Sequence, residues 1–204
     1  MKLSPSEKLI QRIFQSRFGI ALTKIDELHG KKGRTSDFEH VREGQRVFVC
    51  ELKDFEDVPL LKKPGRTIIH HPDGFVETFG KDNSLDRVGR HIRKAHKQLS
   101  KYSEPKVLIF LNYTRSLDVT DLEEAFRGFR IMAVENDTQY VNVYARRVAE
   151  GDIKEIKKEI DLYIWVDTTS DSTSMTEAKV YFRTVTEAGR KLARECFGKP
   201  STVA

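Results

Sequence analysis

The pattern of apolar and polar positions predicts two strands in the interior of a sheet. Residues 46–53 read Arg-Val-Phe-Val-Cys-Glu-Leu-Lys, and the two-residue period of a strand places apolar side chains on both of its faces. Residues 106–113 are similarly apolar and predict a second buried strand. Because a strand with two apolar faces must be covered on both sides, we expect the first strand to be central.

Helical periodicity predicts an N-terminal helix and a strongly basic helix. The first follows Ser4-Pro5-Ser6-Glu7, in which the Ser-x-x-Glu spacing and the proline at the first helical position form a capping box. The second covers residues 84–102. Its apolar stripe comprises Leu85, Val88, Ile92, Ala95, Leu99 and Tyr102, and most of its other positions are cationic.

Beyond residue 113 the pattern predicts elements that extend the sheet. A capping box at residues 120–123 is expected to begin a short helix, and residues 151–161 and 185–197 read as a charged helix and a last helix. Further strands are predicted near residues 129–135, 140–146, 162–167 and 178–184. Residues 67–79 are predicted to form a hairpin around Pro-Asp-Gly.

Charged residues at the end of the first central strand raise the question of function. Glu51 and Lys53 are predicted to share a face with Val47 and Val49, and Asp37 lies on the preceding strand. Burying an unpaired charge costs several kcal/mol or shifts its pKa. These charges should therefore be paired, bind a metal or face a cleft, unless they are solvated at the strand end.

The register of the hairpin decides whether Asp37 and Glu51 face each other. A two-residue turn at Glu43-Gly44 would place Asp37 opposite Cys50, on the wrong face. A three-residue loop or a bulge places it opposite Glu51, and Gly44 can supply the left-handed residue of such a loop. A shared site therefore predicts the longer loop or a bulge.

Asp37, followed across a hairpin by Glu51-Leu52-Lys53, resembles the PD-(D/E)xK nuclease superfamily. The resemblance covers about residues 4–113 and includes the order of elements. In that family a helix carrying a glutamate precedes a three-stranded meander with the Asp and the (D/E)xK, and a helix and another strand follow. The chain departs from the pattern at Ser36, where the family often has proline.

The resemblance implies a restriction-endonuclease-like α/β fold, a mixed sheet flanked by helices. We expect a single domain over residues 1–204, with an inserted hairpin at about residues 56–82 and a C-terminal α/β extension at about residues 114–204. At 204 residues the chain can bury one large core, and no long linker divides it.

The resemblance also implies a metal-assisted reaction. The carboxylates of Asp37 and Glu51 are hard oxygen ligands suited to Mg²⁺, with Mn²⁺ as the alternative, and the main-chain carbonyl of Leu52 is implied as a further ligand. Lys53 would stabilise the attacking water or a phosphate oxygen. Glu7 has two open interpretations, since it can cap its helix or serve as the further catalytic glutamate that related nucleases place there.

The basic helix is the predicted nucleic-acid surface. Its one-sided charge favours phosphate contact, with a merely solvated face as the alternative. Gln98 and Tyr102, at i and i+4, resemble a Gln-x-x-x-Tyr motif of the exonuclease branch of the superfamily, although Tyr102 also fits the core. The predicted contact residues are Arg87, Arg90, Arg93, Lys94, Lys97, Gln98, Lys101 and Tyr102.

Composition agrees with a cytoplasmic protein that meets a polyanion. The formal net charge is +5 and the pI is about 9.1. Only Cys50 and Cys196 occur, and neither a signal peptide nor an 18-residue apolar span is present, so we expect a reducing cytoplasm and no membrane.

The sequence thus predicts a Mg²⁺-dependent nuclease that hydrolyses phosphodiester bonds of DNA, with RNA not excluded. One alternative is a non-catalytic nucleic-acid-binding module that keeps the same fold. An unrelated α/β interaction scaffold is another, but it leaves the buried charges unexplained. The oligomeric state stays open.

Overall fold

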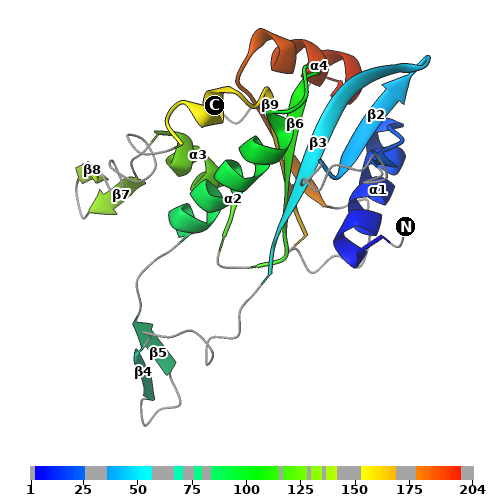
Figure 1. Ribbon diagram of the computed structural model, residues 1–204. Coiled ribbons are helices and arrows are strands. Elements are labelled where there is room, and N and C mark those ends of the chain that lie inside the picture. Colours follow the sequence, from blue (N-terminus) through cyan, green and yellow to red (C-terminus); the bar gives the residue numbers. More distant parts are fainter. Residues whose placement is uncertain are drawn as a thin grey trace.

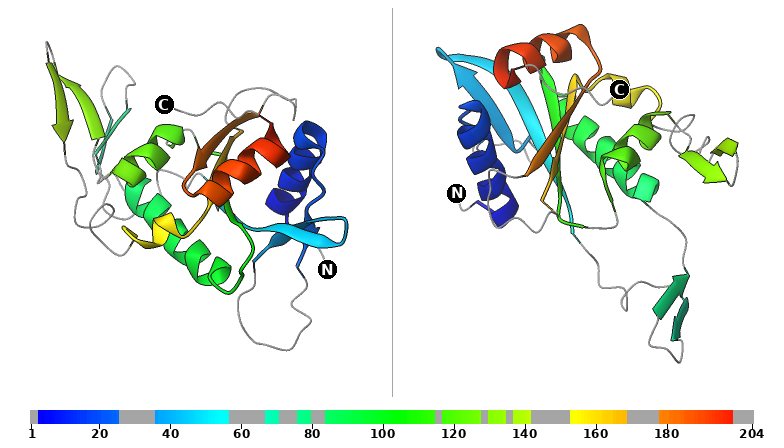
Figure 2. Two further views of the ribbon diagram at one scale, coloured as in Figure 1. Left: turned by 90° about the horizontal axis from the view of Figure 1, so that it is seen from above. Right: turned by 180° about the vertical axis from the view of Figure 1, so that it is seen from behind.

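A six-stranded mixed sheet with helices on both faces forms the body of the protein (Figures 1 and 2), which confirms the predicted α/β class. The computed structural model describes residues 3–25, 36–56, 67–70, 76–79, 84–114, 117–127, 130–134, 137–141, 153–168 and 178–198.

The strand order across the sheet is β1-β2-β3-β6-β9-β10, so β3 is central, as predicted. Strands β1, β2 and β3 form an antiparallel meander, β3, β6 and β9 run parallel, and β10 is antiparallel to β9. The last two strands confirm that the C-terminal part extends the sheet. The strands are β1 Thr23–Lys24, β2 Phe38–Arg42, β3 Gln45–Phe55, β6 Lys106–Asn112, β9 Leu162–Asp167 and β10 Lys179–Thr184.

Two apolar clusters lie on opposite faces of the sheet. Phe48, Cys50 and Leu52 of β3 pack in the cluster that includes α1 and α4, whereas Val49 and Phe55 pack in the cluster that includes α2 and α3. This alternation is the two-residue period of a strand covered on both sides. The helices are α1 Pro5–Phe18, α2 Ser84–Leu99, α3 Val119–Arg127 and α4 Glu187–Phe197.

Two hairpins form small sheets of their own. Strands β4 Thr67–His70 and β5 Val76–Phe79 pair antiparallel, which confirms the predicted inserted hairpin. Strands β7 Arg130–Val134 and β8 Asp137–Val141 also pair. The strand predicted at residues 140–146 therefore begins earlier, and residues 142–150 lie outside the described residues.

Three predicted helix boundaries are wrong. The basic helix ends at Leu99 instead of residue 102, since the Tyr102 N–H donates to the Leu99 carbonyl at 3.0 Å, three residues back, in place of the helical bond four residues back. Helix α3 begins before Thr120, since Asp118 accepts a hydrogen bond from the Thr120 N–H at 2.7 Å and caps the helix instead. The described part of residues 151–161 contains only a turn and the short 3-10 helix η3, Ile156–Lys158.

Within the described segments, no helix is both long and apolar enough to cross a membrane.

A close approach of α4 to the start of β9 depends on Gly189. A β-carbon at this position would overlap the main-chain carbonyl of Asp161. Asp161 in turn accepts hydrogen bonds from the main-chain N–H groups of Val185 and Lys106, at 2.9 and 2.8 Å, and from the Thr186 hydroxyl. The glycine therefore lets α4 pack onto a residue that ties three elements together.

Gly189→Ala is expected to lower the free energy of unfolding by about 1–3 kcal/mol or more, because main-chain atoms must move to admit the methyl group. Arg190→Ala, on the exposed side of the same helix, should change it by about 0.5 kcal/mol or less. Urea unfolding of the two variants measures both values, and equal losses would show that the contact with Asp161 does not constrain α4.

Candidate active site

The hairpin between β2 and β3 sets the register of the site. Glu43 and Gly44 both have positive φ, 52° and 77°, and form a tight two-residue turn that pairs Arg42 with Gln45. A bulge then shifts the register by one residue between His40 and Val41.

The bulge brings Asp37 opposite Glu51. Phe38 pairs with Cys50, so Asp37, the residue before β2, is in register with Glu51. This confirms the predicted choice between a longer loop and a bulge. The bulge also turns Val47 toward the cluster of α1 and α4, so the prediction that Val47 shares the face of Val49 is wrong.

Asp37 is a partly buried carboxylate held by the strand opposite. One oxygen accepts a hydrogen bond from the main-chain N–H of Leu52 at 2.8 Å. Burial raises the pKa of Asp37, and the Leu52 N–H and the Lys53 charge oppose the rise. The Leu52 bond fixes the carboxylate beside the last residues of the β3 ladder.

Glu51 is buried, with an exposed fraction of 1%. One of its oxygens accepts a hydrogen bond from the Lys53 ammonium, whereas Oε2 is buried and has no hydrogen-bond partner in the described part of the chain. Burial and then the Asp37 charge raise the pKa of Glu51 to about 7, against the opposing effect of Lys53. Two facing carboxylates with an unsatisfied oxygen therefore require a cation or a proton.

Lys53 connects β3 to α2. Its ammonium donates to Glu51 and to Gln98 Oε1, the latter at 3.2 Å. Thus Gln98 reaches the site, as its spacing suggested. Tyr102 does not, because α2 ends at Leu99 and the Tyr102 ring instead packs under the Arg46 guanidinium, 5.7 Å from the ring centroid.

The donor set fits a hard divalent cation that keeps several waters. In the described part of the chain, no group of three or more His, Cys, Asp and Glu side chains could hold a metal ion. Asp37, Glu51 and one carbonyl would leave positions for water and phosphate, which suits Mg²⁺. Since the Leu52 N–H points toward Asp37, its carbonyl points to the same side of β3, beyond the first residue of β2.

Glu7 forms the predicted capping box, and both of its oxygens are engaged. Oε2 accepts from the Ser4 N–H at 2.6 Å, the Glu7 N–H donates to Ser4 Oγ at 3.2 Å, and Oε1 pairs with Lys24. The charges of Glu7 and Lys24 both act on the pKa of Asp37. The sequence did not predict that Lys24 lies near the site, because β1 has only two residues and so shows no alternation of apolar and polar positions.

Glu7→Ala should lower the free energy of unfolding by about 0.5–2 kcal/mol, because the N-terminal N–H of α1 loses its acceptor. Glu7→Gln keeps a carbonyl acceptor and should recover most of that loss. Chemical unfolding gives the stabilities, and Mg²⁺ titration of both variants detects any ligand role. A Glu7→Gln variant as unstable as Glu7→Ala would contradict the capping interpretation.

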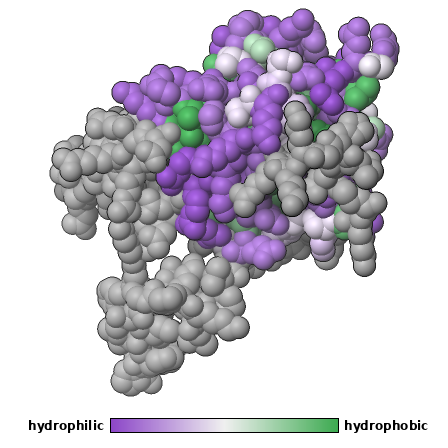
Figure 3. Space-filling model, in the orientation of Figure 1, coloured by the Kyte–Doolittle hydropathy of each residue, from purple (hydrophilic) through white to green (hydrophobic). Residues whose placement is uncertain are grey.

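The outer face of α2 carries the predicted basic surface. Arg90, Arg93, Lys94, Lys97 and Lys101 are exposed, and Figure 3 shows hydrophilic residues across the front face, where α2 lies in Figure 1. Arg87 differs, since it donates to the Glu56 carbonyl at 3.2 Å and lies over the Phe55 ring.

His91, on the same helix, does not belong to the basic surface. Its ring lies edge-on to Phe55, with centroids 4.9 Å apart, and its Nδ1 is buried without a partner among the described residues. Burial, and then the charge of Lys53, lower the pKa of His91 to about 4. The imidazole is therefore neutral at pH 7. Its role was not predicted, because a sequence does not show which turn of a helix meets the strand.

The site thus brings together four of the predicted residues where β2, β3 and α2 meet: Asp37, Glu51, Lys53 and Gln98. The charge of Glu7 acts on the pKa of Asp37, and Tyr102 lies outside the site. Comparisons of the chain with protein-family models, with curated proteins and with solved structures give no match.

Proposed function

We propose that this chain is a metal-dependent nuclease with a restriction-endonuclease-like fold. The observation that carries the proposal is the buried Oε2 of Glu51, which has no hydrogen-bond partner in the described structure, on a residue that is in register with Asp37. Lys53, two residues along the same strand, places an ammonium beside it. A pair of carboxylates and a lysine in this arrangement suits a site that binds a cation and a phosphate.

The order of elements supports the fold part of the proposal. Helix α1 with Glu7 precedes the meander β1-β2-β3, and α2 and β6 follow, with the β4-β5 hairpin inserted between β3 and α2. This is the order that the PD-(D/E)xK resemblance implies. Strand β6 is parallel to β3 and adjacent to it, which keeps α2 against the Glu51 face.

Each residue has a distinct part in the proposed hydrolysis. Bound Mg²⁺ would acidify a water and neutralise charge on the phosphoryl group. Asp37, Glu51 and the Leu52 carbonyl would hold the cation, while Lys53 stabilises charge that develops on a phosphate oxygen or the attacking water. Gln98 keeps the Lys53 ammonium oriented through its 3.2 Å contact.

DNA is the proposed substrate, and RNA shares the phosphodiester chemistry. The exposed cations of α2 lie beside Lys53, where they can contact phosphates on the strand. Both Cys50 and Cys196 are free and buried, which suits the reducing cytoplasm proposed as the location.

Incubation with linear DNA, circular DNA and RNA, each in Mg²⁺ or in EDTA, tests the proposal. Cleavage of at least one substrate in Mg²⁺ and none in EDTA is the expected result. Cleavage in excess EDTA would overturn the metal site. Binding without cleavage, under all metal conditions, would support a non-catalytic nucleic-acid-binding module.

Lys94→Gln with Lys97→Gln should weaken nucleic-acid binding if α2 contacts phosphates. Both residues are exposed and have no ion pair within the described structure. Removing one phosphate contact should reduce the slope of log affinity against log salt by roughly 0.7 to 0.9. The matched control is Lys179→Gln with Lys154→Gln, two exposed lysines on β10 and before η3. An equally large effect from both pairs would mean that general charge, and not α2, attracts the substrate.

A further inference from the structure

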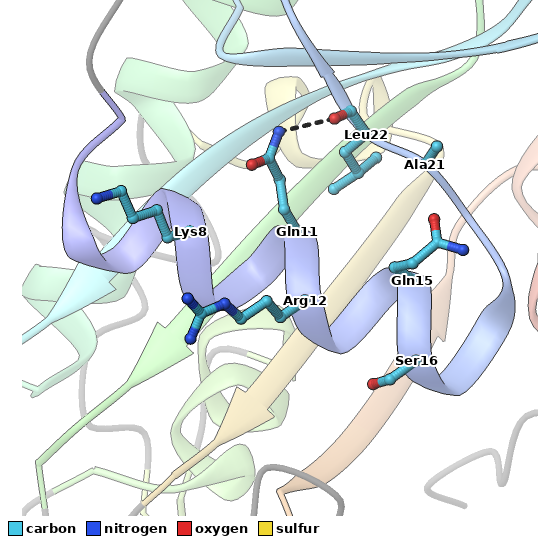
Figure 4. A pocket seen from close by; sticks show the side chains of 7 residues that line it. All are labelled: Lys8, Gln11, Arg12, Gln15, Ser16, Ala21 and Leu22. Carbon is cyan, nitrogen blue, oxygen red and sulfur yellow. Dashed lines mark hydrogen bonds between the residues drawn. The ribbon is translucent and has the colours of Figure 1, made fainter.

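An open pocket of about 570 Å³ lies between α1 and the segment that leads into β1. Figure 4 shows its side chains projecting from successive turns of α1, with Ala21 and Leu22 across from them. The pocket is separate from the contacts that join Asp37, Glu51 and Lys53. Its lining residues are Lys8, Gln11, Arg12, Gln15, Ser16, Ala21 and Leu22.

The charge of the pocket favours an anion. Lys8 and Arg12 are exposed, and neither side chain forms an ion pair or a hydrogen bond with another described residue. None of the lining residues is acidic. Two cations one helical turn apart, without a carboxylate between them, can bind neighbouring phosphate groups.

The pocket also offers hydrogen-bonding groups that suit a nucleobase edge. The Gln11 amide N–H donates to the Leu22 carbonyl at 2.8 Å, which orients this side chain and leaves its own oxygen as an acceptor (Figure 4). The Gln15 side chain is exposed and has no hydrogen-bond partner among the described residues, so its amide offers both a donor and an acceptor. Glutamine amides, with a donor and an acceptor side by side, can pair with the Watson–Crick edge of an unpaired base.

The pocket adjoins the Glu7–Lys24 pair along α1. Glu7 and Gln11 are four residues apart on one face of α1, and they bond to Lys24 and to the Leu22 carbonyl on the neighbouring segment. Both bonds join α1 to β1 or the segment that leads into it, so the Glu7–Lys24 pair lies one helical turn from Gln11. The charges of that pair act on Asp37.

We propose that this pocket binds a nucleotide of the substrate strand, and that the strand is single there. Lys8 and Arg12 contact its phosphates, and the amides of Gln11 and Gln15 contact its base edge. In a duplex that edge is occupied by the pairing partner, whereas an unpaired base presents it freely. The inference rests on the proposed function for the identity of the strand.

Lys8→Gln with Arg12→Gln tests the proposal by fluorescence anisotropy, with a single-stranded oligonucleotide and its duplex in EDTA. All variants also carry Glu51→Gln, which keeps the oligonucleotide and the duplex uncleaved, so that binding is measured apart from cleavage. The double variant should weaken single-strand binding about tenfold and reduce its salt slope by roughly 0.7 for each phosphate that is no longer neutralised. Duplex binding should change less than about twofold. Glutamine suits both exposed helical positions, so the fold should persist.

Arg127→Gln with Lys154→Gln, two exposed cations on α3 and before η3, is the matched control and should leave single-strand binding unchanged. Gln15→Ala should weaken single-strand binding about threefold at unchanged charge. An equal weakening of single-strand and duplex binding, or one matched by the control, would overturn the proposal, as would a mononucleotide that binds as tightly as the oligonucleotide. A protein that shows the expected changes in binding but never cleaves would retain this inference and lose the proposed nuclease function.

Discussion

Asp37→Asn and Glu51→Gln should each lower the rate of phosphodiester cleavage by more than about a hundredfold, while nucleic-acid binding persists. Each change removes an anionic ligand from a cation that would carry charge in the transition state. Each also keeps the shape of the side chain, and the Asn oxygen at position 37 can still accept from the Leu52 N–H. Single-turnover cleavage at saturating enzyme measures the loss.

Asp54→Asn provides the matched control on the same strand. Asp54 is exposed on β3 and accepts a hydrogen bond from Ser6 at 2.9 Å, away from the Glu51 face. Its substitution should change the rate less than about threefold. Full activity of either site variant, or a loss in Asp54→Asn equal to theirs, would remove Asp37 and Glu51 as the metal ligands.

The strand core was predictable because the placement of apolar side chains follows burial. The apolar run on both faces of β3 and the apolar run of β6 predicted central strands, and the two strands pair in parallel at the middle of the sheet. The position of Glu51 and Lys53 on the α2 face followed from the same period. Alternation therefore determines a face wherever the strand is regular.

The bulge shows where alternation stops being sufficient. Val47 is apolar like Val49, and nothing local marks it as the residue left over when His40 pairs with Phe48. The two-residue turn at Glu43 and Gly44 alone would misplace Asp37. A site shared by Asp37 and Glu51 predicted a longer loop or a bulge. It did not predict the position of the bulge, because that position depends on packing against another element.

Partners of charged groups were the least predictable part. Lys157, expected on a solvated helix, is 7% exposed and donates to the Phe126 carbonyl at 2.7 Å. A long aliphatic stem lets a lysine cross apolar surface, so its sequence position does not reveal its burial. The same reason hid the Lys24 pairing with Glu7, whereas Gln98 was found because its helical spacing carried a signal.

Two opposing titrations should control how the stability of the metal-free protein depends on pH. Glu51 has its pKa raised from 4.5 to about 7, so the folded state keeps a proton that the unfolded state releases, and stability falls as pH rises through this window. His91 has its pKa lowered from 6.5 to about 4, so the unfolded state takes up a proton first, and stability falls as pH drops through this window. Between about 4.5 and 6.5 the two slopes have opposite signs and largely cancel.

Single substitutions should therefore separate the two slopes. In EDTA, the free energy of unfolding of Glu51→Gln should rise between about pH 4.5 and 6.5, by up to about 1.4 kcal/mol per pH unit, because the Glu51 titration then no longer opposes that of His91. His91→Gln should show a fall of similar size over the same range. The lowered pKa of Glu7 acts below about 4.5 and leaves this range undisturbed.

Urea unfolding of the wild type and both variants at half-unit steps from pH 4.5 to 8 measures the slopes. Mg²⁺ should reverse the Glu51 contribution in the wild type and in His91→Gln but not in Glu51→Gln, since a ligand carboxylate must lose its proton before it binds a cation. Parallel curves for all three proteins in EDTA would mean that Glu51 is already ionised at low pH. The buried oxygen would then have a partner in solution, and the site would have no need of a cation.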